Sequence, residues 1–372
     1  MKAASFWREV GRNLSTGTTR AVTFGMCLAV IVGALCVAEL GTIRDILHSE
    51  RAYRASGADI TVLTASARID GKACDRLVDI PGIIAAGAIR ETRTRLTVTV
   101  LPDAPIPVSE ISPGFQHLVD AHGGSGIDLG PEAQQTLKAR PGSQLATAAG
   151  PVRVAGSYAY PDDGRRQGLR YAVLEPSITP DAFDECWVRQ WPQSDDTNSL
   201  LLLSMTPQAQ QPASSSANAS TSPGTEAQAP QPPSFTQLNS TLGSRFAGLA
   251  AFESRVTKSS PLVAAIAGLL LAYLSIRLRR LQFASALHAG VARSDHVLMV
   301  LVETGAWIVG GLIIALPTVT LTAASTVTPD SSAVFDLGGA IMVAASVGGI
   351  LGAVLAAVST REKHLFRYFK DR

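Results

Sequence analysis

The sequence predicts an α-helical membrane protein with four transmembrane helices and an α+β extracytoplasmic domain between helices 1 and 2. Two observations lead to this fold class. The chain contains four long apolar runs, and about 20 apolar residues in a helix are enough to cross the hydrocarbon core of a bilayer. Between the first two runs lies the stretch 44–258, much of which has the turn signals and apolar alternation of a folded domain. A chain of 372 residues has room for two or three such structural units.

The chain begins with a short basic segment, residues 1–20, followed by the first apolar run at 21–43. Only Glu39 interrupts this run, which therefore predicts the first membrane helix. A cleaved signal peptide is the alternative, with a cleavage site at Cys36-Val37-Ala38, but the run is longer than the apolar part of a usual signal peptide. The helical pattern continues past the run, so residues 44–52 predict a stalk.

Residues 53–205 predict the folded α+β domain. Asp70 is a good cap for a helix over 71–79, which Pro81-Gly82 ends, and Pro131 can open a second helix over 132–139. The run 59–65 is β-rich and predicts a strand, and further short runs between turn signals predict strands at 84–89, 96–101, 106–111, 144–147, 152–160, 171–174 and 199–205.

Two of the four cysteines, Cys74 and Cys186, lie in this domain, whereas Cys27 and Cys36 lie in the first apolar run. A disulfide formed in an oxidising exterior would close a loop of roughly 110 residues and add about 4 kcal/mol in the chain-entropy treatment. Two unpaired, buried thiols are the alternative. The sequence leaves both open.

Composition changes abruptly over residues 206–234, which contain six prolines, no Lys or Arg, and Glu226 as the only charge. Such a segment cannot bury enough apolar area to offset its ordering entropy, so it predicts a disordered linker. Beyond it, apolar residues recur every three or four positions and predict a second stalk helix over 235–258. These residues are Leu238, Leu242, Phe246, Leu249, Phe252 and Val256.

The remaining apolar runs predict membrane helices at 259–276, 296–322 and 333–358. The segment 277–295 and the tail 359–372 are basic, whereas the loop 323–332 contains no Lys or Arg. Positive residues collect on the cytosolic side of membrane helices. We therefore expect a multi-pass protein of the cell (plasma or inner) membrane, with both termini and segment 277–295 in the cytosol and the large domain outside.

The segment 277–295 combines arginines with apolar residues and predicts a short helix held against the inner face of the membrane. Its order of residues, from Arg280-Leu281-Gln282-Phe283-Ala284 to Ala286-Leu287-His288-Ala289-Gly290 and later Glu303-Thr304, resembles the coupling region of FtsX/MacB-type ABC transporter permeases. Gln282 stands where the family often has Glu, and His288-Ala289-Gly290 replaces its Gly-Ala-Ser. The run Gly57 to Thr64 and the later Ile80-Pro81-Gly82-Ile83 resemble the start of the MacB-like extracytoplasmic core domain.

This resemblance implies a permease subunit that works by mechanotransmission, bound to a separate cytosolic ABC ATPase subunit. It also implies a homodimer, or a pseudo-dimer with a related permease, in contact with membrane lipid. The large outer domain favours efflux or extraction of a peptide, drug, lipid or lipoprotein. The residues expected to couple to the ATPase are Arg277, Arg279, Arg280, Leu281, Gln282, Phe283, Ala284, Leu287 and Arg293.

The sequence contains no G-x-x-x-x-G-K-[ST], H-E-x-x-H, C-x-x-C or G-x-S-x-G motif. We therefore expect no catalytic residue, no metal and no cofactor, and we expect the chain not to be an enzyme. His117 and His122 lie five residues apart in a Gly-rich loop and make a weak metal candidate. A net charge of +2, with no basic face interleaved with aromatic residues, argues against nucleic acid as a partner.

Glu303 is the one acid in the third membrane helix, where a carboxylate is costly unless it faces protein or water. We expect it at a helix interface near the coupling segment, the alternative being a side chain that reaches the cytosolic headgroups. The spacings Gly348-x-x-x-Gly352 and Ala306-x-x-x-Gly310 are typical of close helix packing and give weak support to a dimer.

Two other functions remain open at this stage. One is a membrane-anchored sensor or adaptor, and the other is an FtsX-like regulator of cell-wall hydrolases that transports nothing. A sensor has no need of the Arg-Phe-Ala pattern in its inner loop, so an ATPase partner separates the permease from the sensor.

Overall fold

A computed structural model describes residues 3–122, 125–177, 181–206, 232–325 and 331–360. The chain divides into two compact units. We call Met1–Ser49 with Ala247–Arg372 the helical unit, and Glu50–Phe246 the sheet unit. Nearly all of the expected linker 206–234 and of the basic tail 359–372 lies outside the described residues, as does the central part of the loop 323–332.

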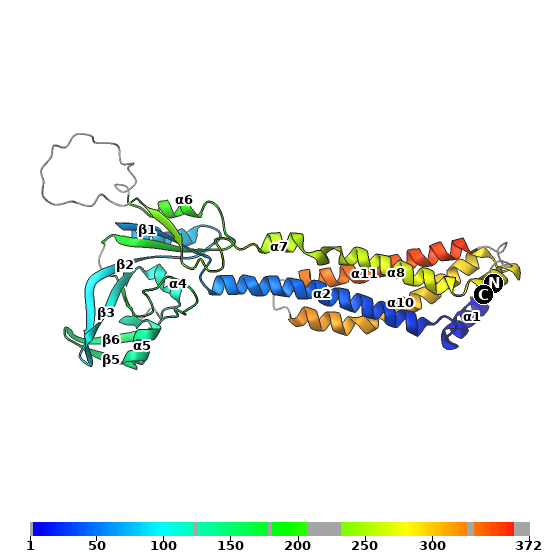
Figure 1. Cartoon of the computed structure of the whole chain (residues 1–372), viewed down its shortest axis with the longest axis horizontal. Coiled ribbons are helices and arrows are strands. Elements are labelled where there is room, and N and C mark those ends of the chain that lie inside the picture. The colour runs from blue at the N-terminus through cyan, green and yellow to red at the C-terminus, as the bar shows by residue number, and fades with distance from the viewer. Residues whose placement is uncertain (1–2, 123–124, 178–180, 207–231, 326–330, 361–372) are drawn as a thin grey trace, which may run out of the picture. The chain divides into compact units, whose positions relative to one another are not determined.

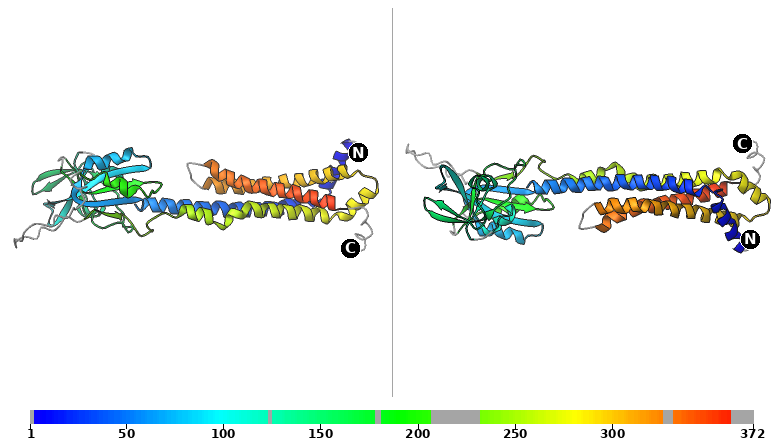
Figure 2. Two further views of the ribbon diagram at one scale, coloured as in Figure 1. Left: turned by 90° about the horizontal axis from the view of Figure 1, so that it is seen from above. Right: turned by 90° about the horizontal axis from the view of Figure 1, so that it is seen from below.

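The helical unit contains four helices long and apolar enough to cross a membrane, counted over the described residues. The expectation of four such helices is therefore confirmed. Figures 1 and 2 show them lying side by side. The elements of this unit are α1 (Ala3–Ser15), α2 (Ala21–Ala55, of which the residues from Glu50 on belong to the sheet unit), α7 (Gly248–Ser254), the 3-10 turn η4 (Val256–Ser259), α8 (Ser260–Arg277), α9 (Arg280–His288), α10 (Arg293–Ser325) and α11 (Ser331–Ser359).

Glycines bring α8 and α11 into backbone contact. A methyl group at Gly348 would overlap the carbonyl of Ala265, and one at Gly352 would overlap the carbonyl of Leu269. In an apolar solvent, van der Waals contact of this kind is a main source of helix association. The spacing Gly348-x-x-x-Gly352 thus packs helices of one chain together, which corrects its interpretation as a sign of dimer packing.

A second close crossing joins α2 to α10. A methyl group at Gly311 would lie 2.6 Å from the carbonyl oxygen of Gly25, and one at Gly25 would lie 3.1 Å from that of Trp307. The rings of Phe24 and Trp307 pack beside this crossing with their centroids 6.0 Å apart. Gly310, the glycine of the other small-residue spacing, faces open space.

The sheet unit is built on one mixed sheet of nine strands in its described residues, in the order β3-β7-β4-β6-β5-β2-β8-β1-β9, with an additional β2–β3 pairing. The pairs β3–β7 and β4–β6 are parallel and the other pairs are antiparallel. The strands are β1 (Ile60–Ile69), β2 (Ile83–Val98), β3 (Leu101–Ile111), β4 (Ile127–Leu129), β5 (Gln144–Thr147), β6 (Gly150–Ser157), β7 (Val173–Pro176), β8 (Phe183–Gln190) and β9 (Ser234–Gln237). The helices and 3-10 turns are α3 (Gly71–Asp75), η1 (Arg76–Asp79), η2 (Pro113–Phe115), α4 (Gln116–Val119), α5 (Pro131–Leu137) and α6 (Thr197–Leu202).

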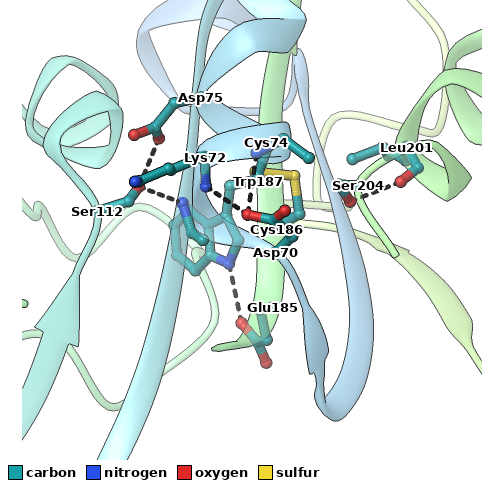
Figure 3. Close-up of a disulfide and its surroundings, with 12 residues drawn as sticks. Asp70, Lys72, Cys74, Asp75, Ser112, Glu185, Cys186, Trp187, Leu201 and Ser204 are labelled. Atoms are coloured by element: carbon teal, nitrogen blue, oxygen red, sulfur yellow. Dashed lines mark hydrogen bonds between the residues drawn. A yellow bond between two sulfur atoms is a disulfide. The ribbon is translucent and has the colours of Figure 1, made fainter. Parts of the chain in front are cut away.

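The centre of this sheet is buried on both faces. Neighbouring residues of a strand point to opposite faces, and on β8 both Cys186 and Trp187 are fully buried. Trp187 packs edge-on against Phe115 at a centroid distance of 5.0 Å, and its indole donates to Glu185. Cys186 forms a disulfide with Cys74 of α3, with a Cα–Cα distance of 5.9 Å, as Figure 3 shows. The disulfide therefore fastens α3 to a central strand.

Local signals predicted where α3 and α5 of this unit begin. The Asp70 carboxylate caps α3 by accepting from the amides of Lys72 and Ala73, at 2.9 and 3.2 Å. The helix expected over 71–79 then continues as the 3-10 turn η1. Pro131 opens α5, and β5 occupies the residues expected for it.

Three sequence-based expectations are wrong. Residues 199–205 form no strand, because α6 begins at Thr197 and buries Leu201 against the sheet. The stalk helix over 235–258 is replaced at its start by β9, which pairs with β1 in the register Thr61↔Gln237 to Thr64↔Ser234. The strands expected at 84–89 and 96–101 are not separate: one long strand, β2, continues from the first to Val98, a turn follows at 99–100, and β3 begins at Leu101. In each case a partner distant in sequence decides the conformation.

The glycine contact predicts the effect of two matched substitutions in α11. Gly348→Ala should lower the thermal stability of the detergent-solubilised protein, because relieving the overlap with Ala265 separates two helices at a cost of about 1–3 kcal/mol. Gly339→Ala should leave stability unchanged or raise it, because nothing lies within 4 Å of an added methyl there. Both changes gain the same helix propensity. Equal melting temperatures for the two variants would contradict the close contact.

The disulfide predicts a strong dependence of the sheet unit on oxidation. Cys186→Ser should lower its free energy of unfolding by about 4 kcal/mol, because the unfolded chain is no longer cross-linked. Denaturant unfolding followed by Trp fluorescence measures this. Reductant should produce the same loss in the wild type and none in the variant. Alkylation of Cys74 and Cys186 without prior reduction would show that the bond does not form.

Candidate functional site

The candidate site of the helical unit is centred on Glu303 of α10, which is 3% exposed. Its carboxylate has a partner on each oxygen. Asn13 Nδ2 of α1 donates to Oε1 at 2.8 Å, and Arg279 Nη1 donates to Oε2 at 2.6 Å. A buried carboxylate in an apolar bundle needs such compensation, because desolvation of the bare charge costs several kcal/mol. One side chain thus joins three separate parts of the chain.

Arg279 lies in the short turn that separates α8 from α9. The backbone tightens there, with the amides of Leu278 and Arg279 bonded to the carbonyls of Leu274 and Ile276 at 3.0 Å each. This turn aims the guanidinium inward, where it is 13% exposed and stacks over the ring of Phe283 at 4.8 Å. Helix α9 ends at His288, and Gly290 follows two residues later with a φ of +91°, a conformation that suits glycine.

Phe283 forms the apolar half of the site. It is 4% exposed and meets the ring of His296 edge-on, with centroids 4.6 Å apart. His296 is also 4% exposed, and its Nε2 has no hydrogen-bond partner among the described residues. A cavity of about 540 Å³ lies here between α1, α9 and α10, lined in part by Asn13, Arg279 and both rings.

The structure separates the nine residues expected to couple to an ATPase into three groups. Arg279, Phe283 and Ala284 point inward, and Ala284 is fully buried. Gln282 and Arg293 are exposed, and the other four are half-buried: Arg277, Arg280, Leu281 and Leu287. Among these, Arg277 stacks over Tyr273 at 5.7 Å. The exposed side of α9 consists of Gln282, Ser285 and His288, followed by Ala289.

A second buried ion pair lies near the other end of α8, just before the helix begins. Arg255 Nε, from the segment just before α8, donates to Glu39 Oε1 of α2 at 2.9 Å, with both side chains less than one-tenth exposed. The Arg255 guanidinium also stacks over Phe252 at 3.8 Å and donates to its carbonyl at 2.5 Å. Sequence analysis noted Glu39 only as an interruption and missed Arg255 and Asn13. Neither has a periodic or motif signal, since their partners are more than two hundred residues distant in the chain.

A second candidate location lies in the sheet unit, where several polar side chains surround the disulfide, as Figure 3 shows. A cavity of about 600 Å³ is lined there by residues that include Asp70, Asp75 and Phe183. Burial raises the pKa of Asp75, while a hydrogen bond from Ser112 Oγ, 2.5 Å from Oδ1, acts in the opposite direction. Among the described residues no group of three or more His, Cys, Asp or Glu side chains is arranged to hold a metal ion.

No family model and no curated protein matches this sequence. Among solved structures, the chain is similar to the periplasmic region of MacB from Actinobacillus actinomycetemcomitans, with a TM-score of 0.31 and 12% identity over 41% of this chain and 83% of that one. It is also similar to the extracellular domain of the noncanonic ABC-type transporter YknZ from Gram-positive bacteria, with a TM-score of 0.27 and 14% identity over 38% and 88% of the two chains. Likenesses this low do not identify the fold or the function.

The pair at the site predicts a non-additive response to mutation. Glu303→Leu should cost about 3–5 kcal/mol of stability, because it leaves Arg279 charged and buried without its partner. The double variant Arg279→Met with Glu303→Leu should recover most of that loss. Thermal unfolding in detergent measures both.

The surface pair Arg12–Glu9 supplies the control for that cycle, because its side chains are 66% and 35% exposed. Replacing both with Gln should change stability by less than about 1 kcal/mol. Additive losses from the Arg279 and Glu303 substitutions would show that the two side chains do not interact.

Proposed function

We propose that this chain is the permease subunit of an ABC transporter of the MacB/FtsX type. The observation that carries the proposal is the link formed by Asn13, Arg279 and Glu303 directly behind α9. Because one buried carboxylate joins α1, the α8–α9 turn and α10, a force on the exposed side of α9 reaches two neighbouring helices. The order of elements adds support, since a large folded unit separates the first apolar helix from the other three.

The orientation follows from charge and from the disulfide. Segments 1–20, 277–295 and 359–372 carry Lys and Arg next to the apolar runs, whereas the loop 323–332 carries none, so these segments are proposed to face the cytosol, with both termini inside. The sheet unit then lies outside. An exterior position fits the Cys74–Cys186 disulfide, because such bonds persist in oxidising compartments.

The contact with the ATPase is proposed to involve the exposed side of α9 and the start of α10, at Gln282, Ser285, His288 and Arg293. Phe283 and Ala284 contribute indirectly, by anchoring α9 to the helical unit. Closure of the ATPase subunits on ATP would push on this surface. ATP hydrolysis itself belongs to the partner chain, so this chain is proposed not to be an enzyme.

The complex is proposed to contain two copies of the chain, or one copy with a related permease. It would move the sheet unit mechanically rather than carry a substrate through a channel. Export or extraction of a peptide, drug, lipid or lipoprotein suits a large outer unit with a cavity of about 600 Å³.

Affinity purification tests the proposal. The chain carrying a C-terminal tag, isolated from native membranes in mild detergent, should bring with it a stoichiometric protein that contains a P-loop. A preparation that lacks any ATP-binding partner even after crosslinking would contradict the proposal. That result would favour a membrane-anchored sensor or adaptor.

The docking surface predicts a selective loss of this partner. Ser285→Asp with Arg293→Glu should reduce recovery of the ATPase by about tenfold or more, because charge reversal at an interface disfavours association. Thr136→Asp with Arg140→Glu makes the same change in charge on exposed residues of the sheet unit and should leave recovery unchanged. Equal recovery with both variants would remove α9 from the interface.

A further inference from the structure

The two chain connections between the units differ in continuity. The outgoing connection is α2, an uninterrupted helix from Ala21 to Ala55. The returning connection is broken: β9 ends at Gln237, α7 covers only Gly248–Ser254, and the backbone is extended at Arg255 before η4 begins. Two stalk helices were expected. The outgoing connection is one long helix, but the returning connection is a series of short segments.

Helix α2 enters the sheet almost without a loop. Gly57, with a φ of +72°, ends the helix, and the amides of Ser56, Gly57 and Ala58 bond back to carbonyls of its last turn at 2.9–3.2 Å. Strand β1 begins at Ile60. The backbone groups at this junction are therefore hydrogen-bonded, and little free rotation remains.

Side chains from elsewhere in the sheet unit complete this cap. Arg165, with a side chain 7% exposed, donates to the carbonyl of Ala55 and is held by the Asp163 carboxylate at 3.2 Å. Asn239, which is fully buried, donates to the carbonyls of Ser56 and Asp163 at 3.1 and 3.0 Å. The carbonyls at the end of α2 are thus hydrogen-bonded to side chains from two other parts of the sheet unit, Arg165 and Asn239.

An aromatic cluster joins the outgoing and the returning connections at the same place. Tyr53 of α2, 2% exposed, packs against Phe246 and Trp191 with centroids 5.6 and 6.4 Å away, and these two rings lie 5.7 Å apart. The Tyr53 hydroxyl accepts from the amides of Gln237 and Gln193 at 2.9 and 3.0 Å. The same Gln193 accepts from the backbone amide of Phe246 at 2.9 Å.

We propose that residues 53–57 and 238–246 form a rigid joint with the sheet. We further propose that α2, and not the return segment 247–259, transmits movement into the sheet unit. Hinge motions need a few residues free to change their backbone angles. The backbone of residues 53–57 is helical or hydrogen-bonded in the cap, whereas the return segment 247–259 has breaks at both ends of α7. The transmitting role rests on the proposed function; the rigidity of the joint does not.

Spin-label distances test the rigidity directly. Nitroxides at Arg51→Cys and Gln135→Cys, both exposed sites of the sheet unit, are introduced in the full chain with Cys27 and Cys36 replaced by Ala and the disulfide left oxidised. The wild-type joint should give one narrow distance distribution. Tyr53→Ala with Phe246→Ala should broaden it at least twofold. Phe235→Ala, an aromatic truncation on β9 outside the joint, should not.

Either a broad distribution in the wild-type joint or an unchanged width in the joint variant overturns the rigid joint. A melting curve of each variant shows whether the sheet unit is folded. If the aromatic variant does not fold, Gln193→Ala with Gln237→Ala removes only the polar half of the joint and should still broaden the distribution.

Insertions test the transmitting role in the chain purified with its ATPase. Gly-Ser-Gly placed between Leu47 and His48 interrupts α2, and the same insertion between Ala247 and Gly248 lengthens the return segment. The first should abolish the nucleotide-dependent change in hydrogen exchange of the sheet unit while ATP hydrolysis continues; the second should preserve it. The reverse pattern overturns the role of α2. If the wild type shows no nucleotide-dependent change in hydrogen exchange, both the transmitting role and the proposed function are overturned. The spin-label distance widths then still test whether the joint is rigid.

Discussion

The constraint on which the helical unit depends is that a carboxylate inside an apolar bundle must be paired. Two buried acids, Glu39 and Glu303, satisfy this constraint, because each is paired with an arginine next to one end of α8. Arg255, before α8, bonds to Glu39 of α2, and Arg279, after α8, bonds to Glu303 of α10. Between them the glycine contacts with α11 hold α8 along its length. A helix fixed at both ends and along one side can move only with its neighbours, and α9 begins where α8 ends.

The sheet unit is stabilised differently, because it has a core on both faces of one sheet. Trp187 and Cys186 are neighbours on β8 and belong to the two opposite cores, so this strand cannot shift without disturbing both. The disulfide adds a covalent link to α3. Under the proposed function, the unit would act as a single body when α2 displaces it, whereas a flexible domain would absorb the movement by deforming.

Local sequence signals predicted much of this structure, and they failed where a remote partner decides the outcome. Asp70 caps α3 and Pro131 opens α5, since both effects operate within one helical turn. The apolar spacing after residue 234 fits a helix, and the free edge of β1 overrides it at the start, where β9 forms. The basic segment 277–295 was recognisable, but its division into an anchoring side with Phe283 and an exposed side with Gln282 depends on α1 and α10.

By itself, the sequence determined the four apolar helices, their order around a large insert and the charged segments between them, because length, hydrophobicity and charge act through the surrounding solvent. Only the tertiary structure decided which partners satisfy Glu39 and Glu303, which glycines face a neighbouring backbone, and that Cys74 meets Cys186. Such pairings depend on the distance between residues that are far apart in the chain. That distance in space cannot be read from the spacing of residues along the chain.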